Sequence, residues 1–136
     1  MKNEVVVDTN IISYIIKSDS RAVEYENILR EFELHIISFQ SLAELELWGI
    51  KNNWGVQRMR NLASFLSTYQ IAYPNSDVCS IWAKIMNESR SNGYLLSASD
   101  GWIASIAIYL ECPLMTHNYN DFAHLQNLEL ITRYKI

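Results

Sequence analysis

Short apolar runs alternate with segments of helical spacing along almost the whole chain, and this alternation constrains the fold more than any other feature. Five runs have the length and composition of strands, and in chain order they are Val5–Val7, Leu34–Ile37, Ile71–Tyr73, Leu114–Thr116 and Leu128–Ile131. Strands that are separated by helices pair in parallel, because each crossover helix packs back onto the sheet. The alternation therefore predicts an α/β fold in three layers, with a short central parallel sheet of four to five strands and helices on both faces.

Helices are expected in the intervals between these strands. Their expected ranges in chain order are 11–16, 22–32, a helix carrying Leu42 to Trp48, 56–66, 77–90 and 100–110. Residues that favour N-caps stand where three of them begin, namely Ser38 or Ser41, Asn75 or Ser76, and Ser97 or Ser99. The chain has 136 residues, of which 49% are hydrophobic and 19% charged. This size and composition predict a single domain over residues 1–136.

The charge balance is acidic, with a formal net charge of −4. It counts against nucleic-acid binding, unless divalent cations neutralise an acidic pocket or the 11 Lys and Arg residues gather on one face. The cysteines, Cys79 and Cys112, are isolated from each other, which fits a reducing cytosol. No apolar run approaches the roughly 20 residues of a membrane span, and no signal peptide precedes the first strand. We therefore expect a cytoplasmic protein without membrane contact.

Four acidic residues fall where the predicted sheet would bring them together. Asp8 follows the first strand, and Asp121 lies a few residues past the strand at Leu114–Thr116. Asp100 and Glu44 lie near the starts of helices, where the helix dipole favours a negative charge. Parallel sheets bind their ligands in the crevice beyond the carboxyl ends of the strands. We therefore expect the four carboxylates to converge at that end of the sheet.

Converging carboxylates repel one another, so either a shared proton or a hard divalent cation must hold them together. Mg²⁺ and Mn²⁺ prefer oxygen ligands, and Mg²⁺ typically takes one or two carboxylates together with waters and substrate phosphates. Sites of this kind hydrolyse phosphodiesters, because the cation lowers the pKa of a water and neutralises charge on the phosphate. The acids therefore indicate metal-dependent phosphodiester hydrolysis.

Each acid also has an ordinary structural explanation. The sequence Ser41-x-x-Glu44 has the spacing of a capping box, in which Glu44 would serve the helix alone. Asp100 could simply compensate a helix dipole, and Asp8 and Asp121 have the positions of helix caps. These explanations leave open why all four acids fall in connections at one end of the sheet.

Four motifs surround the acids in a fixed order. They are the hydrophobic strand ending in Asp8-Thr9-Asn10, Ile37-Ser38 followed by Leu42-Ala43-Glu44-Leu45 and Gly49, the helix Asp100-Gly101-Trp102-Ile103-Ala104-Ser105-Ile106-Ala107, and the turn Leu114-Met115-Thr116-His117-Asn118-Tyr119-Asn120-Asp121-Phe122. Together they resemble the PIN-domain endoribonucleases, and among these the VapC-type toxins of prokaryotic toxin–antitoxin pairs. The third motif is the most specific, because it is similar to the family's D-x-W-I-A-A-x-A helix. The four motifs span nearly the whole chain.

The resemblance implies roles for the acids. It implies that Asp8 and Asp100 bind the metal, Mg²⁺ or Mn²⁺, and that Glu44 completes the catalytic site with an acid or an amide from the last motif. That motif offers both Asn118 and Asp121. We prefer Asp121 as the fourth catalytic acid and Asn118 as an amide that positions the substrate.

The resemblance also implies the reaction and the partners. Thr9 and Thr116 are expected to hold substrate or a water beside the metal. The expected reaction is the hydrolysis of RNA phosphodiester bonds by a metal-dependent endoribonuclease, the toxin of a toxin–antitoxin pair. A cognate antitoxin that covers or disturbs the active site is implied, and so is a homodimer. The alternative from another class is a catalytically silent PIN domain that acts as a protein- or RNA-binding module.

The chain departs from the family pattern at two positions. Gly101 stands where the family often has Ala, and Cys112 takes a position often held by Gly. Neither position is expected to touch the acids. A phosphate-accepting receiver domain fits less well, because that class needs paired acids after the first strand, where this chain has only Asp8, and a Lys near a late strand. No Lys lies between Lys84 and Lys135.

The remaining candidates are expected to be structural. His117 could contact RNA, but we expect a solvent-facing residue of a turn. Trp48, Trp54, Trp82 and Trp102 could stack on bases, but at helical spacing we expect them in the core or at an interface.

Overall fold

The computed structural model describes residues 3–133, and its centre is a five-stranded sheet in the order β3-β2-β1-β4-β5. The strands are β1 (Glu4–Val7), β2 (Leu34–Ser38), β3 (Gln70–Ala72), β4 (Leu114–Met115) and β5 (Leu130–Ile131). Every neighbouring pair is parallel. All five predicted strands are therefore present. The strands β4 and β5 are shorter than their predicted ranges of 114–116 and 128–131, and β3 lies one residue earlier than its predicted range of 71–73.

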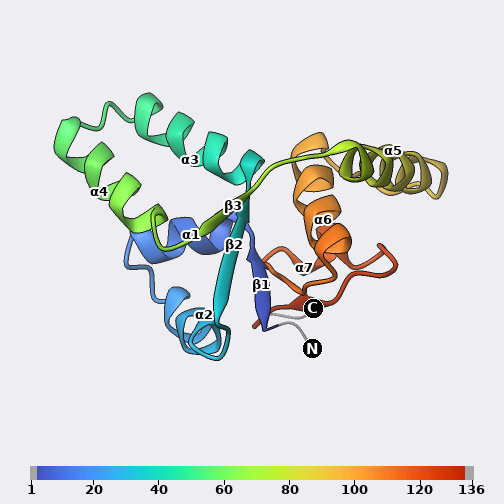
Figure 1. Ribbon diagram of the computed structural model, residues 1–136, viewed down its shortest axis with the longest axis horizontal. Helices are drawn as coiled ribbons and strands as arrows, with labels where there is room; N and C mark the ends of the chain where they lie inside the picture. Colours follow the sequence, from blue (N-terminus) through green and yellow to red (C-terminus); the bar gives the residue numbers. More distant parts are fainter. Residues whose placement is uncertain (1–2, 134–136) are drawn as a thin grey trace.

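Helices cover both faces of this sheet. They are α1 (Thr9–Ile16), α2 (Ala22–Leu29), α3 (Phe39–Lys51), α4 (Val56–Leu66), α5 (Ser76–Ser91), α6 (Ala98–Leu110) and α7 (Tyr119–Phe122). Figure 1 shows α1 to α4 on one side of the sheet and α5 and α6 on the other. The three-layer α/β fold is therefore confirmed. Of the helices between residues 3 and 133, none has both the length and the apolar character that a membrane crossing requires.

The starts of three helices are set by side chains that cap them. Ser38 caps α3, Asn75 caps α5 and Ser97 caps α6, each by accepting a hydrogen bond from the backbone N–H three residues later. In each pair of candidates the first residue is the cap. Consequently α6 begins at Ala98, two residues before the start that the sequence predicts at Asp100.

The central strand β1 separates two hydrophobic cores. Val5, Val6 and Val7 are fully buried, as expected for a strand with helices on both faces. Because neighbouring side chains of a strand point to opposite faces, Val5 and Val7 enter the core beneath α1 to α4, and Val6 enters the core beneath α5 and α6. Burying one valine contributes about 1.5–3 kcal/mol. This packing fixes the register of β1, and with it the position of the residue that follows the strand.

The order of the strands creates a crevice at the end of β1. The chain adds β2 and β3 on one side of β1 and then β4 and β5 on the other. Ligands of such sheets bind at this switch point, outside the carboxyl ends of the two strands that diverge there. Asp8, the first residue after β1, donates its backbone N–H to the carbonyl oxygen of Met115 at 2.9 Å. The fold therefore places Asp8 where β1 and β4 end together.

Three of the four tryptophans pack against the two cores, as the sequence predicts, and the fourth, Trp82, contacts one of them. Trp48 and Trp54 lie against the core beneath α1 to α4, and Trp102 lies against the other core. Trp82 stacks on Trp102, with their ring centroids 4.8 Å apart and an interplanar angle of 14°.

The glycine at position 101 lets α5 and α6 approach closely. A Cβ atom there would lie 2.6 Å from the sulfur of Met86 and 2.9 Å from Nε1 of Trp82. Trp82 Nε1 donates a hydrogen bond to the carbonyl oxygen of Ala98 at 3.2 Å. The Gly101 departure from the family pattern is therefore explained by the Met86 sulfur and the Trp82 indole, which occupy the space of an alanine methyl.

The second departure lies at the end of α6. The residue that takes the left-handed conformation there is Glu111, with φ of 56°. Cys112 is 4% exposed and belongs to the core beneath α5 and α6. The side chain of Cys112 therefore fills part of the core, while Glu111 makes the left-handed turn. Within residues 3–133 neither Cys79 nor Cys112 forms a disulfide.

We expect Gly101→Ala to destabilise the protein, although alanine favours helices by about 1 kcal/mol over glycine. The new methyl group would displace the Trp82 indole and break its bond to Ala98, for a net loss of about 1–2 kcal/mol. Denaturant unfolding followed by tryptophan fluorescence measures both effects. Gly55→Ala is the control, because a Cβ there meets no atom within 4 Å. A Gly101→Ala protein with raised stability and unchanged fluorescence would contradict this explanation.

Candidate active site

Asp8 is an acid buried at the switch point, with an exposed fraction of 4%. It is the N-cap residue of α1, as its position after the strand predicts, and Oδ1 accepts a hydrogen bond from the backbone N–H of Thr9 at 2.7 Å. Oδ2 accepts one from the hydroxyl of Thr116 at 2.7 Å. Thr116 is fully buried at the end of β4, and its Oγ1 accepts the backbone N–H of Asn118 at 3.1 Å. The two strand ends and the last turn are thus tied together through one carboxylate.

Glu44 does not belong to a capping box. Because Ser38 is the N-cap of α3, Ser41 is the third residue of the helix and Glu44 lies a further turn inside it. Oε1 of Glu44 accepts a hydrogen bond from the hydroxyl of Thr9 at 2.7 Å, and Oε2 accepts one from the hydroxyl of Ser99 at 2.9 Å. The capping-box interpretation is therefore wrong, and Glu44 joins α3 to the first turns of α1 and α6.

A fourth hydroxyl group extends this network. Thr9 Oγ1 lies 2.8 Å from Ser41 Oγ as well as 2.7 Å from Glu44. A hydroxyl has one proton, and an ionised carboxylate only accepts, so Thr9 donates to Glu44 and accepts from Ser41. From the sequence, Ser41 and Ser99 are expected only as caps. The signal for Ser99 was its place directly before Asp100, in the first turn of a helix whose start faces the site.

Asp100 and Asp121 form the more exposed part of the site. Asp100 is half-buried in the first turn of α6, where its backbone N–H is bonded to Ser97. Asp121 is exposed in α7. Burial raises the pKa of Asp100, and the charges of Asp121 and Glu44 raise it further, whereas the side chain of Ser97 opposes the shift. The carboxylates of Asp121 and Asp100 are therefore close enough to repel each other.

The buried acid Asp8 is the most strongly perturbed group of the site. Burial raises its pKa from 3.8 to about 7; the charges of Asp100 and Glu44 act in the same direction, and the hydrogen bonds from Thr116 and Thr9 act against it. All charges that perturb Asp8 and Asp100 are negative. The site therefore concentrates negative charge that a bound cation would compensate.

The four acids have the chemistry to bind a hard divalent cation, although they do not surround a cation site by themselves. Within residues 3–133, no group of three or more His, Cys, Asp or Glu side chains is placed so that it could hold a metal ion. Mg²⁺ usually needs fewer protein ligands than that, because waters and substrate phosphates complete its octahedron. The four acids offer only oxygen, which is the ligand that Mg²⁺ and Mn²⁺ prefer.

The last motif brings its polar residues to the site in different ways. Asn118 is exposed and precedes α7 without capping it through its side chain. His117 is not the solvent-facing residue that we expected, since it is half-buried against two tyrosine rings. Its ring centroid lies 5.3 Å from that of Tyr14 and 5.8 Å from that of Tyr25, and its Nδ1 is 2.8 Å from the hydroxyl of Tyr25. Tyrosines of α1 and α2 thus cover the histidine, which the sequence of the turn alone does not show.

Comparisons with known proteins agree on one family. The family model described as PIN domain matches residues 5–128. Ribonuclease VapC1 of Haemophilus influenzae strain R2866 is 30% identical over 129 residues, which cover 91% of this chain and 93% of the relative. Ribonuclease VapC2 of Rickettsia felis is 28% identical over 127 residues, with coverages of 92% and 94%.

Solved structures give the same result. VapBC2 from Rickettsia felis, bound to a DNA fragment from its promoter, has a TM-score of 0.84 and 27% identity over 95% of this chain and 98% of that chain. VapBC-1 from nontypeable Haemophilus influenzae has a TM-score of 0.81 and 26% identity, with coverages of 95% and 97%.

We expect Asp8→Asn to stabilise the metal-free protein at about pH 8 and to have little effect at about pH 4. An Asp whose pKa is raised in the folded state loses stability as the pH rises from its unfolded value of 3.8 to about 7. The shift corresponds to about 4 kcal/mol, which the neutral amide would not lose. Thermal unfolding in EDTA across this pH range measures the difference. An equal effect at both ends of the range would contradict the raised pKa.

Proposed function

This chain belongs to the PIN domain family, and on that premise we propose that it is a divalent-metal-dependent endoribonuclease, the toxin of a toxin–antitoxin pair. The observation that carries the proposal is the buried Asp8 at the switch point of the sheet, with its pKa raised by burial and by the charges of Asp100 and Glu44. Such an arrangement is unfavourable for stability alone, and perturbed acids of this kind gather at functional sites. The relatives named Ribonuclease VapC support RNA as the substrate.

Asp8 and Asp100 are the residues that would hold Mg²⁺ or Mn²⁺. Both are oxygen donors, and their mutual repulsion is what a cation would relieve. A divalent cation, when bound, would lower the pKa of the attacking water and neutralise negative charge on the phosphate. Thr116 positions Asp8 for this role, because its buried hydroxyl donates to the carboxylate.

Glu44 and Asp121 are the acids that remain to orient the attacking water and accept its proton. Glu44 is suited to this because the hydroxyls of Thr9 and Ser99 fix both of its oxygens. Asp121 is exposed, and its negative charge raises the pKa of Asp100. This electrostatic contact supports Asp121 as the fourth acid, and it leaves Asn118 to position the substrate through its exposed amide.

The proposed partner of the toxin is a cognate antitoxin, and a homodimer is proposed as well. Relatives of this chain have been solved as VapBC assemblies, which supports the antitoxin. Leu47 and Ile50 of α3 and Val56 of α4 are 55%, 68% and 69% exposed. Leu47 and Ile50 are neighbours on the surface of α3, because they are three residues apart, and adjoining exposed apolar side chains are typical of contact surfaces. We therefore place the antitoxin against the end of α3.

We expect purified protein to cleave a pool of single-stranded RNA with Mg²⁺ or Mn²⁺ and to be inactive in EDTA. Asp100→Asn should reduce the rate by about 100-fold or more, because it removes a metal ligand while preserving the start of α6. Asp77→Asn is the matched control, since Asp77 is an exposed acid in the first turn of α5. Metal-dependent cleavage that survives Asp100→Asn would overturn the site, and folded, antitoxin-free protein without any cleavage would favour a binding-only domain.

Ser99→Ala should lower the cleavage rate about 10- to 100-fold without abolishing it. The variant removes one of two hydroxyl donors to Glu44 and leaves the carboxylate in place. The loss of one such bond costs only about 1 kcal/mol of stability, so a thermal melt should change little. Single-turnover rates at saturating RNA measure the effect. A wild-type rate would show that the Ser99 bond has no part in orienting Glu44.

A further inference from the structure

The short helix α7, which carries Asp121, needs support from other parts of the chain. It has four residues, whereas isolated helices shorter than about 12–15 residues are marginal in water. Its first turn has no side-chain cap, because Asn118 makes no such hydrogen bond. Asp121 also lies near a like charge, since it raises the pKa of Asp100. Contacts outside α7 must therefore hold Asp121 against this repulsion.

His124 makes two such contacts directly after α7 ends. Its Nε2 lies 2.9 Å from the hydroxyl oxygen of Ser89, a residue of α5 that is 3% exposed. Its ring stacks on the ring of Tyr94, with the centroids 4.2 Å apart and an interplanar angle of 9°. Burial lowers the pKa of His124, so the imidazole is uncharged at neutral pH. A hydroxyl at one edge and a phenol ring over one face thus hold a neutral imidazole.

The end of α5 fixes both partners of His124. The backbone N–H of Tyr94 donates to the carbonyl oxygen of Ser89 at 2.8 Å, and the N–H of Gly93 donates to that of Arg90 at 3.2 Å. Gly93 has φ of 80°, so these two bonds form a Schellman motif that turns the chain at the end of the helix. Both contacts of His124 therefore come from one hydrogen-bonded turn.

We propose that His124 is a positioning residue of the acidic site, which holds the end of α7 against the end of α5 and so fixes the position of Asp121 relative to Asp100. The helix α5 is in turn bonded to the start of α6, where Trp82 Nε1 donates to the carbonyl oxygen of Ala98 at 3.2 Å. Both acids thus share α5 as a support, although they come from α6 and α7. The inference rests on the proposed function in taking Asp121 as the fourth catalytic acid.

The contacts of His124 are tested first without any reaction, by hydrogen exchange of single backbone amides. The N–H groups of Asp121, Ala123 and Leu125 make hydrogen bonds within α7 and the turn after it, so they report whether this segment opens. In His124→Ala their exchange should be about tenfold faster, because one hydrogen bond and one ring contact are lost. The N–H of Gly101 in α6 should exchange as in the wild type, whereas a loss of global stability would accelerate all four.

Cleavage of single-stranded RNA with Mg²⁺ then tests the role of His124 in the reaction. His124→Ala should lower kcat about tenfold and leave KM for RNA unchanged, because it displaces an acid that orients water and removes no contact to RNA. In an Asp121→Asn background the same change should have almost no further effect, since His124 acts through Asp121. His124→Phe keeps the stack on Tyr94 but loses the bond to Ser89, and should give an intermediate rate.

The matched control is His35→Ala. His35 is half-buried like His124, its Nε2 lies 2.7 Å from the carbonyl oxygen of Leu29, and its ring centroid lies 5.7 Å from that of Tyr69. It stands near the start of β2, at the end of the sheet away from the acids. Its substitution removes one hydrogen bond and one ring contact as well, and should change neither exchange in α7 nor kcat.

The outcomes separate this inference from the proposed function. Unchanged exchange in α7 of His124→Ala, an equal loss of kcat in His35→Ala, or an undiminished effect in the Asp121→Asn background would overturn the positioning role. If α7 opens but kcat keeps its wild-type value, the positioning role fails while the nuclease proposal stands. If folded wild-type protein never cleaves RNA, the nuclease proposal fails, and hydrogen exchange alone decides whether His124 holds α7 in place.

Discussion

The carboxylate of Asp8 is almost completely removed from water beside other negative charges, and the end of the sheet is arranged to hold it there. Hydrogen bonds from Thr116 and Thr9 favour its charged form, whereas burial and the neighbouring acids oppose it. Burial and the neighbouring acids have the larger effect, so the pKa of Asp8 rises to about 7. A sheet selected for stability alone would place an apolar residue here, since replacing buried charge with apolar packing is often neutral or stabilising. The position of Asp8 is therefore understood through chemistry rather than through stability.

Holding such a group requires contacts from distant parts of the chain. Thr116 is 108 residues away from Asp8, Ser99 is 55 residues away from Glu44, and Thr9 is 35 residues away from Glu44. Only the parallel sheet brings these segments together, because its strand ends and helix starts share one edge. The fully buried valines of β1 fix that edge from within. The packing of β1 and the polar contacts beyond its end thus together determine the position of Asp8.

The parts of this arrangement that follow local rules could be predicted from the sequence. The β-branched run of β1 and the acids after it identify a buried strand and a site at its carboxyl end. The cap of α3 could not be decided, because Ser38 and Ser41 both satisfy the local requirements of an N-cap. Once Ser38 is the cap, Glu44 leaves the first turn, and its partners become hydroxyls that no local rule can identify. His117 shows the same limit, because the two tyrosines that bury it come from helices far away in the sequence.

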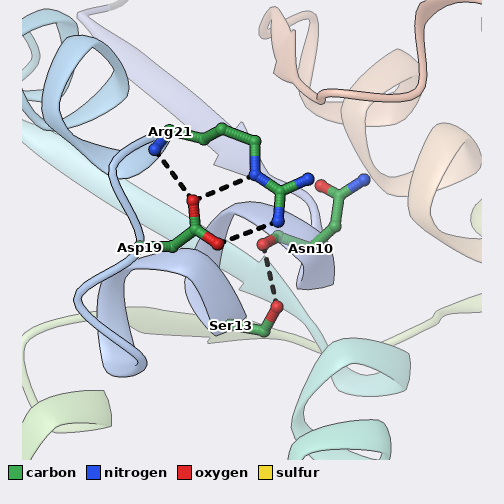
Figure 2. A network of polar contacts seen from close by, with 4 residues as sticks. All are labelled: Asn10, Ser13, Asp19 and Arg21. Carbon is green, nitrogen blue, oxygen red and sulfur yellow. Dashed lines mark hydrogen bonds and ion pairs between the residues drawn. The ribbon is translucent and has the colours of Figure 1, made fainter.

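The polar groups of the site are of two kinds: those with hydrogen-bond partners inside the protein, and those left at a cost in stability. Ser38, Ser41 and Thr116 are fully buried, and each makes a hydrogen bond within the protein. The acid Asp8, by contrast, is buried beside other negative charges, and the side-chain polar atoms of Asn10 have no hydrogen-bond partner within residues 3–133 (Figure 2). Any ligand that binds only the folded chain stabilises it in proportion to the logarithm of its concentration over its Kd. A cation beside Asp8 would therefore return stability that this residue costs the free protein, so that binding and folding would be coupled at this edge of the sheet.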